Sequence, residues 1–204
     1  MEICGVILAG GRSKRFGKDK ALLNIGGTYV INRLANLLEE CFFKAVVVVK
    51  NKEQHLKVEK IIDNPHIKIL EDNCEIFSPI AGLSGILNAV EEKFIFVVAC
   101  DMPLVNKRVI SRIISELDES VDCIVPIFEN RLEPLCAVYR KNIFQNRNFE
   151  ESMHSVIDGC NCTKKITFSD PADFLNINTV ENLKEVKPQS ALEANLHTQH
   201  ITAQ

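Results

Sequence analysis

The chain has 204 residues and a formal net charge of −3, with 46% hydrophobic and 25% charged residues. This composition is typical of a folded globular protein and excludes disordered and fibrous classes. The mild negative charge gives no indication of nucleic-acid binding, and the apolar runs are shorter than the roughly 20 residues that cross a membrane. We therefore expect neither nucleic acid nor a membrane among its partners.

An apolar run over residues 3–8 opens the chain and predicts a buried strand. The small residues Ala9, Gly10 and Gly11 follow it and would let another group approach the backbone closely. Five cations come next, at Arg12, Lys14, Arg15, Lys18 and Lys20. A loop rich in N–H groups and cations at the end of a first strand suits a polyphosphate, although a plain glycine-rich turn is the alternative. Its spacing matches neither the Walker loop nor the dinucleotide-binding loop.

Helices and strands then alternate through the first half of the chain. Apolar residues at helical spacing predict helices at residues 28–42, 52–63, 79–90 and 106–119. Unbroken apolar runs predict strands at residues 45–49, 67–70 and 94–100. This alternation predicts an α/β fold with a doubly wound, mostly parallel, Rossmann-like sheet flanked by helices.

The second half of the chain has shorter elements. Strands are predicted at residues 122–128, 132–139, 163–168 and 173–177, with a turn at residues 129–131. Residues 140–159 are helical in part, and a last helix is predicted at residues 179–186. No apolar face repeats beyond this helix, so we expect one domain over residues 1–187 and a disordered tail over residues 188–204.

Three of the predicted strands end in residues suited to nucleotide binding: the glycine loop, Asp72 and Asp101. Because ligands of open α/β sheets bind outside the carboxyl ends of the strands, we expect these residues to meet in one crevice. An aspartate fixed by a very apolar strand can hold Mg²⁺ against phosphates, although Asp101 could instead support the turn that follows it. Lys20 and Arg15 could neutralise charge that builds on a leaving pyrophosphate.

The eight cysteines are scattered, and several lie inside predicted strands. We expect buried thiols rather than a disulfide framework. Cys160 and Cys162 are the only close pair, and a zinc site there would need further ligands, so we keep it as a minor alternative. The chain begins with a core strand and shows no basic leader, so we expect a cytoplasmic protein.

Residues 8–23, Leu-Ala-Gly-Gly-Arg-Ser-Lys-Arg-Phe-Gly-Lys-Asp-Lys-Ala-Leu-Leu, resemble a specific signature. They are similar to the loop of the nucleotidyltransferases that build the dinucleotide form of molybdenum cofactor, above all the guanylyltransferases of the MobA family. The resemblance extends in order over residues 3–186. It includes Cys-Asp-Met-Pro at residues 100–103, the glycine-containing helix start at residues 78–83 and Asn-x-Asn-Thr at residues 176–179.

The resemblance implies a fold of the nucleotide-diphospho-sugar transferase type and a set of site residues. Lys20, Arg15 and Asp101 would be catalytic, with Mg²⁺ on Asp101, and Asn176 and Asn178 would bind the acceptor. GTP would contact Leu8, Ala9, Gly10, Gly11, Lys20, Asp72 and Asp101. As a hypothesis of our own, the Asp72 carboxylate accepts from the N1–H and amine of guanine, which would disfavour adenine.

The implied reaction transfers GMP from GTP to the phosphate of molybdopterin, releasing pyrophosphate, with cofactor-biosynthesis proteins and molybdoenzymes as further partners. Two departures limit the resemblance. Some members have an asparagine where this chain has Val49-Lys50-Asn51, so that contact is not carried over, and residues 150–162 are too acidic to favour a phosphorylated acceptor.

Three alternatives to this reaction remain. One is a metal-binding cysteine protein, which bound zinc in the purified protein would support. Another is a different nucleotidyltransferase, either a cytidylyltransferase on the same cofactor or a sugar- or alcohol-phosphate nucleotidyltransferase. The sugar-phosphate enzymes usually carry a Gly-Thr-Arg-Met loop and a larger sugar-binding portion, and this chain lacks both. A non-catalytic GTP-binding module is the third alternative, and it would bind GTP without releasing pyrophosphate.

Overall fold

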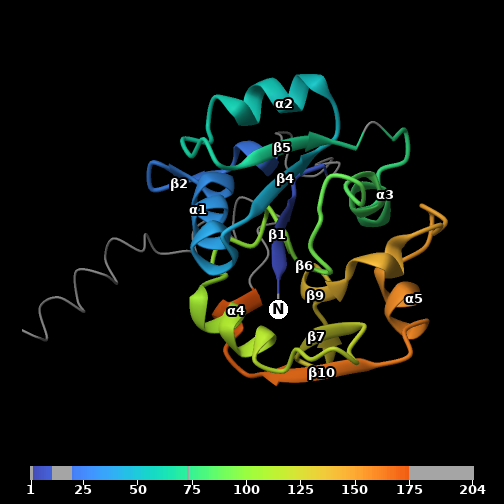
Figure 1. Ribbon diagram of the computed structural model, residues 1–204. Helices are drawn as coiled ribbons and strands as arrows, with labels where there is room; N and C mark the ends of the chain where they lie inside the picture. The colour runs from blue at the N-terminus through green and yellow to red at the C-terminus, as the bar shows by residue number, and fades with distance from the viewer. Residues whose placement is uncertain (1, 11–19, 73, 175–204) are drawn as a thin grey trace, which may run out of the picture.

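The structure is a computed structural model that describes residues 2–10, 20–72 and 74–174 (Figure 1). Within these residues, eight strands form one sheet in the order β10-β7-β9-β6-β1-β4-β5, with β8 paired to β7. The strands are β1 (Ile3–Leu8), β4 (Ala45–Val49), β5 (Lys68–Glu71), β6 (Phe94–Ala99), β7 (Cys123–Phe128), β8 (Arg131–Leu132), β9 (Cys136–Arg140) and β10 (Thr163–Phe168).

Parallel pairing dominates the half of the sheet that contains the first strand. β1 pairs in parallel with β4 on one side and with β6 on the other, and β4 pairs in parallel with β5. β9 runs antiparallel to both β6 and β7, while β10 is parallel to β7. The sheet is mixed but mostly parallel, so the predicted fold class is confirmed.

Helices cover both faces of the sheet because its central strands are apolar on both faces. In β1, Ile7 belongs to one core together with Leu34 of α1 (Val30–Phe42) and Ile110 of α4 (Lys107–Ile114). Its neighbour Val6 belongs to a second core with Ile80 of α3 (Pro79–Gly85). The helices are α1 (Val30–Phe42), α2 (Lys52–Glu59), α3 (Pro79–Gly85), α4 (Lys107–Ile114) and α5 (Met153–Asp158), with short 3-10 helices η1 (Lys20–Leu22), η2 (Lys141–Phe144) and η3 (Pro171–Phe174).

The predicted start of the first helix is wrong. Thr28–Tyr29 forms strand β3, which pairs antiparallel with β2 (Asn24–Ile25). The turn between them is Gly26-Gly27, with φ of 60° and 91°. Two positive φ values in a two-residue turn match the twist of a hairpin, so these glycines build a turn, and α1 begins only at Val30.

Other predicted boundaries shift for local reasons. The helices predicted at residues 52–63, 79–90 and 106–119 end earlier, at Glu59, Gly85 and Ile114. The strand predicted at residues 132–139 is divided into β8 and β9, because Pro134 between them has no N–H for the ladder. The predicted turn lies at Glu129-Asn130, where φ is 48° and 60°.

The end of the described chain differs from the prediction as well. Residues 173–174 belong to the 3-10 helix η3 rather than to a strand. The rest of that predicted strand, the predicted helix at residues 179–186 and the predicted tail lie outside the described residues, so the domain limits stay a prediction. The described helices are too short or too polar to cross a membrane.

Candidate active site

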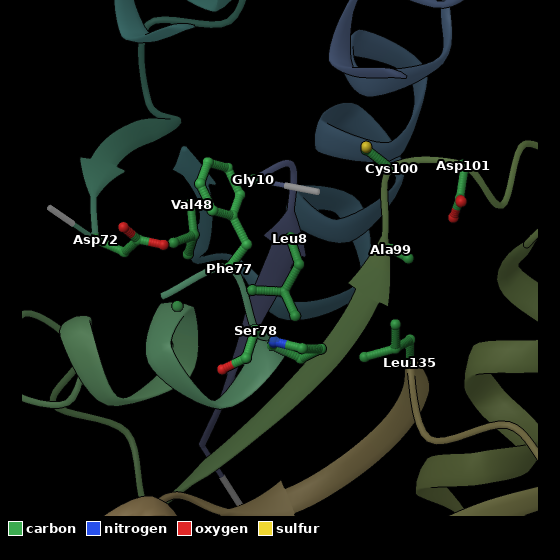
Figure 2. A pocket seen from close by; sticks show the side chains of 12 residues that line it. Leu8, Gly10, Val48, Asp72, Phe77, Ser78, Ala99, Cys100, Asp101 and Leu135 are labelled. Atoms are coloured by element: carbon green, nitrogen blue, oxygen red, sulfur yellow. The ribbon is translucent and has the colours of Figure 1, made fainter. Parts of the chain in front are cut away.

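A pocket opens at the carboxyl ends of β1, β4, β5 and β6 (Figure 2). Gly10 follows β1, Asp72 follows β5 and Asp101 lies just beyond β6, and all three line the pocket, so the predicted meeting of these residues in one crevice is confirmed. The other lining residues come from the same strands and their ends, α3 and the segment leading into it, and the loop before β9: Leu8, Val48, Phe77, Ser78, Pro79, Gly82, Ala99, Cys100 and Leu135.

Backbone hydrogen bonds fix the pocket residues by extending the parallel ladders beyond the strand ends. The Ala9 N–H donates to the carbonyl of Val48, and the Asp72 N–H donates to the carbonyl of Val49, both at 2.9 Å. The Cys100 N–H donates to the carbonyl of Leu8, the last residue of β1, at 3.1 Å. The loop after β1, Asp72 and the segment at Asp101 are therefore held on one rigid edge.

Asp72 is paired with a lysine that sequence reasoning missed. Lys50 Nζ lies 3.1 Å from Asp72 Oδ1, and the two side chains are only 8% and 5% exposed. The same ammonium donates to the Ile76 carbonyl at 2.7 Å, and the Cys74 N–H donates to Asp72 Oδ1 at 2.9 Å. A buried carboxylate needs such partners, because burial without them costs several kcal/mol.

Glycines leave space beside the Asp72 carboxylate. A Cβ atom at Gly10 or Gly82 would lie 3.8 Å or 4.0 Å from Asp72 Oδ2. At Gly85 it would lie 3.3 Å from Asp72 Cα. Glycine inside a helix costs about 1 kcal/mol relative to alanine, and the close approach of α3 to Asp72 and Leu8 explains why two are present there.

Gln54 connects the loop after β1 to α2, and sequence reasoning missed it too. Its amide nitrogen donates to the Ala9 carbonyl at 2.9 Å, and its amide oxygen accepts from the Lys50 N–H at 2.7 Å. Gln54 is 8% exposed. A buried glutamine satisfied on both ends fixes the backbone that leads into the glycine loop.

Asp101 sits on a turn that α1 holds in place. The Met102 N–H donates to the Ala99 carbonyl at 3.2 Å, which forms the turn around Asp101. Arg33 donates from Nη1 to the Pro103 carbonyl at 2.5 Å and from Nη2 to the Val105 carbonyl at 3.0 Å. This fork fixes the chain just beyond Asp101.

Among the described residues, Asp101 is the pocket carboxylate that best suits a magnesium ion bound to phosphates. The described residues contain no group of three His, Cys, Asp or Glu side chains suited to a metal ion. Mg²⁺ bound to phosphates commonly takes one or two carboxylates from the protein and the remaining oxygens from phosphates and water. Asp101 is partly exposed at the pocket and could supply such a carboxylate.

A family model described as a MobA-like NTP transferase domain matches residues 5–154. The chain belongs to this family. A probable molybdenum cofactor guanylyltransferase from Clostridium perfringens is 30% identical, over 88% of this chain and 93% of the relative. Another, from Pelotomaculum thermopropionicum, is 34% identical over 76% of this chain and 71% of the relative.

Solved structures agree with the fold of a MobA-like transferase. Molybdopterin-guanine dinucleotide biosynthesis protein A from Archaeoglobus fulgidus has a TM-score of 0.69 at 21% identity, covering 89% of this chain and 95% of that one. A Mycobacterium tuberculosis protein in complex with manganese has a TM-score of 0.67 at 16% identity, covering 91% of this chain and 97% of that one. The fold of the nucleotide-diphospho-sugar transferase type is thereby confirmed.

Several predicted site residues of this MobA-like transferase are not described. Gly11, Arg15, Asn176 and Asn178 lie outside the described residues. Lys20 begins η1, and its side chain also falls outside the description. Leu8, Gly10, Asp72 and Asp101 line the pocket, and Ala9 lies between two of them with its carbonyl held by Gln54.

The loop before β9 contributes Leu135 to the pocket and places a carboxylate nearby in sequence. Burial raises the pKa of Glu133 above its ordinary value of 4.5, while Arg131 acts in the opposite direction. The Glu133 N–H donates to the Pro126 carbonyl at 2.9 Å, which fixes this loop on β7. A half-buried carboxylate with a raised pKa therefore lies two residues from the pocket lining.

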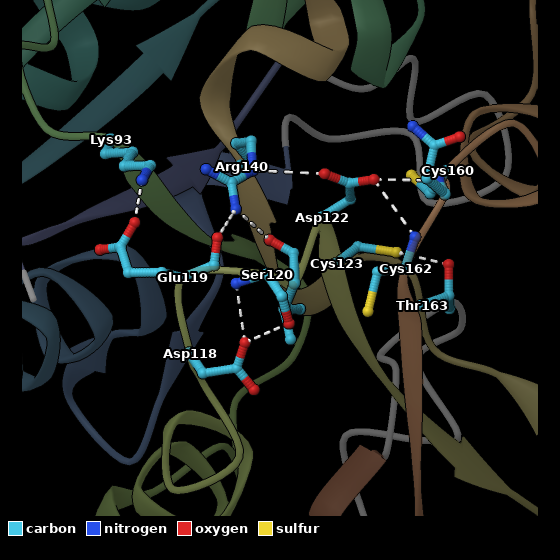
Figure 3. Close-up of polar contacts among 12 residues, drawn as sticks. Lys93, Asp118, Glu119, Ser120, Asp122, Cys123, Arg140, Cys160, Cys162 and Thr163 are labelled. Carbon is cyan, nitrogen blue, oxygen red and sulfur yellow. Dashed lines mark hydrogen bonds and ion pairs between the residues drawn. The ribbon is translucent and has the colours of Figure 1, made fainter.

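Asp122 anchors the turn that contains the close cysteine pair (Figure 3). Asp122 Oδ2 accepts from the N–H groups of Asn161 at 2.9 Å and Cys162 at 3.2 Å, and Asp122 Oδ1 accepts from Arg140 Nε at 3.2 Å. These bonds join the turn after α5 to the beginning of β7 and the end of β9. All eight cysteines lie among the described residues and are free thiols.

Proposed function

We propose that this chain transfers GMP from GTP to the terminal phosphate of molybdopterin, giving the guanine dinucleotide form of the cofactor and pyrophosphate. The observation that carries the proposal is the meeting of Gly10, Asp72 and Asp101 in one pocket. It is supported by relatives that are named probable molybdenum cofactor guanylyltransferase and match most of the chain.

The phosphate end of GTP belongs at the loop after β1 and at Asp101. Asp101 would hold Mg²⁺, which when bound neutralises charge on the triphosphate. Lys20 and Arg15, from the predicted phosphate loop, would stabilise the negative charge that develops on the leaving pyrophosphate. Gly11 would let the phosphates approach the backbone closely.

The base end belongs at Asp72. Oδ2 is the carboxylate oxygen nearest to Gly10 and Gly82, where no side chain obstructs it. Guanine presents an N1–H and an exocyclic amine, both donors, whereas adenine and cytosine place a ring acceptor beside their amine. A fixed carboxylate therefore favours guanine.

The transfer itself needs no general base from the protein. A phosphate monoester is already largely ionised at neutral pH, so its oxygen can attack the α-phosphorus of GTP directly. A bond forms between that oxygen and the α-phosphorus, and the bond from the α-phosphorus to the bridging oxygen of pyrophosphate breaks. Catalysis then consists of positioning and charge neutralisation.

Asn176 and Asn178 remain the proposed acceptor contacts, and cofactor-biosynthesis proteins and molybdoenzymes remain the proposed partners in the cytoplasm. The acceptor side rests on the resemblance of the sequence. The nucleotide side rests in addition on the pocket, so it is the side to test first.

The decisive experiment measures binding of GTP, CTP and ATP by calorimetry with and without Mg²⁺, followed by pyrophosphate release with molybdopterin. We expect Mg²⁺-dependent binding of GTP alone, and pyrophosphate release only when molybdopterin is added. Asp101→Asn should lose Mg²⁺-dependent GTP binding and pyrophosphate release. Asp63→Asn, at an exposed aspartate of the loop before β5, should keep both activities. A preference for CTP would reassign the base, and binding without pyrophosphate release would indicate a binding module.

A further inference from the structure

Lys50 is a buried cation that the proposed chemistry does not use. It follows β4 directly, is 8% exposed and lies outside the set of residues that line the pocket. Burying a lysine is costly unless its ammonium is paired and hydrogen-bonded. Lys50 Nζ meets that condition with Asp72 Oδ1 at 3.1 Å, Asp72 Oδ2 at 3.4 Å and the Ile76 carbonyl at 2.7 Å.

The same ammonium also contacts the aromatic ring at the pocket wall. Lys50 Nζ lies 4.5 Å from the centroid of the Phe77 ring, within the range of a cation–π contact. Phe77 is 43% exposed and lines the pocket, and Figure 2 shows its ring on the same side of the pocket as Asp72. One lysine therefore fixes both the carboxylate and the segment that carries the ring.

The lysine determines how Asp72 presents its oxygens. A carboxylate has about four acceptor positions. Oδ1 accepts from the Cys74 N–H and forms an ion pair with Lys50 Nζ at 3.1 Å. Among the described residues, Oδ2 accepts a single hydrogen bond, from Lys50 Nζ at 3.4 Å, and it lies beside Gly10 and Gly82. Because Oδ1 is held by the Cys74 N–H and by the ion pair with Lys50, Oδ2 is the oxygen that can accept from a base in the pocket.

We propose that Lys50 is a positioning residue that sets base selection in this pocket, by holding Asp72 Oδ2 toward the base and Phe77 beside it. The inference rests on the proposed guanine-nucleotide function. Lys50 does not touch the nucleotide, and its effect passes through Asp72. Without its charge, the buried carboxylate loses its principal partner, and Oδ2 is no longer held toward the base.

The test compares GTP with ITP, whose base keeps the N1–H but lacks the exocyclic amine. Calorimetric affinities of both Mg²⁺ complexes are measured for the wild-type chain and for Lys50→Met. A hydrogen bond to a charged group is worth roughly a 10- to 100-fold change in affinity, so the wild-type chain should prefer GTP by about that factor. Lys50→Met should weaken GTP binding and bring the ratio of the two affinities close to one.

Controls separate a positioning role from a loss of structure. Lys52→Met removes an exposed lysine two positions along the chain and should leave both affinities unchanged. Lys50→Arg keeps the charge and the donors and should recover part of the GTP preference. If Lys50→Met fails to fold, Lys50→Gln, which keeps a donor for Ile76 without a charge for Asp72, should show the same loss of preference.

The outcomes distinguish this inference from the function on which it rests. An equal loss of GTP and ITP affinity in Lys50→Met, with the ratio preserved, would overturn the positioning role alone, and so would an unchanged ratio at unchanged affinity. A wild-type chain that binds no guanine nucleotide would overturn the proposed function and the inference together.

Discussion

The side-chain amide of Gln54 lies between two strand ends: its nitrogen donates to the Ala9 carbonyl at 2.9 Å and its oxygen accepts from the Lys50 N–H at 2.7 Å. Both bonds are buried. Replacing Gln54 with leucine would leave the carbonyl and the N–H without these partners, at a cost of about 1–3 kcal/mol for each such group.

We therefore expect Gln54→Leu to lower the free energy of unfolding by about 2–6 kcal/mol in urea titrations. Affinity for Mg²⁺-GTP should also fall, because the backbone leading into the glycine loop is released. Gln145→Leu, at an exposed glutamine after η2, should stay within about 0.5 kcal/mol of the wild-type value. A stable Gln54→Leu variant would mean that the amide bridge does not hold the loop.

The pocket could be predicted from the sequence because its elements follow from strong local patterns. The runs at residues 45–49 and 94–99 are unbroken and apolar, which fixes them as central strands, and parallel strands must end together. Asp72 and Asp101 then have to meet the glycine loop. Their convergence therefore followed from the parallel arrangement of the strands, without knowledge of the strand order.

Lys50, Gln54 and Arg33 could not be predicted in the same way. A lysine after a strand, a glutamine in a charged helix and an arginine in an amphipathic helix normally face solvent. Their partners lie 22, 45 and 70 residues away in the sequence, so only the tertiary fold brings them together. The one local signal was the position of Lys50 directly after five buried residues of β4.

The Lys50–Asp72 pair predicts a specific pattern of stability. Removing one partner of a buried ion pair leaves an uncompensated charge and typically costs about 3–5 kcal/mol, whereas replacing both partners with apolar residues is often nearly neutral. Lys50→Met alone should therefore be more destabilising than the double variant Lys50→Met, Asp72→Leu. Urea unfolding of both variants gives the comparison, and additive losses would show that the two side chains do not interact.

Arg33 should influence metal-dependent binding from a distance. Its fork bonds the carbonyls of Pro103 and Val105, just beyond Asp101. Arg33→Met should lower the free energy of unfolding by about 1–3 kcal/mol and reduce Mg²⁺-dependent GTP affinity. Arg33→Lys should recover only part, because an ammonium cannot reproduce the fork. Equal calorimetric affinities for wild type and Arg33→Met would show that the turn at Asp101 holds without it.

Two glycines should respond to alanine in opposite ways. A Cβ atom at Gly5 would lie 2.8 Å from Leu38 Cβ, which α1 holds in place, whereas at Gly10 the nearest atom would be 3.6 Å away. Gly5→Ala should cost about 1–3 kcal/mol of unfolding free energy without changing GTP affinity. Gly10→Ala should keep its stability but bind GTP less tightly, because the new methyl group lies beside Asp72 Oδ2. A loss of GTP affinity in Gly5→Ala together with a loss of stability in Gly10→Ala would contradict the packing.

The last prediction concerns pH and Glu133, whose pKa is raised above 4.5 by burial. A raised pKa means that the folded chain binds this proton more tightly than the unfolded chain, so protonation favours folding. Stability from this group is complete below pH 4.5 and is lost as the pH rises through the folded-state pKa. Glu133→Gln, which resembles the protonated form, should therefore be more stable than wild type at pH 7 and equal to it at low pH.

Thermal unfolding between pH 4 and pH 8 measures this difference. The difference in unfolding temperature between Glu133→Gln and wild type should increase with pH. For Glu59→Gln, at an exposed glutamate of α2, this difference should not increase. A gap that stayed constant over the whole range would mean that glutamine changes the packing of the loop beside the pocket. A variant less stable than wild type at pH 7 would mean that Arg131 outweighs burial at this carboxylate, the reverse of the order inferred from the structure.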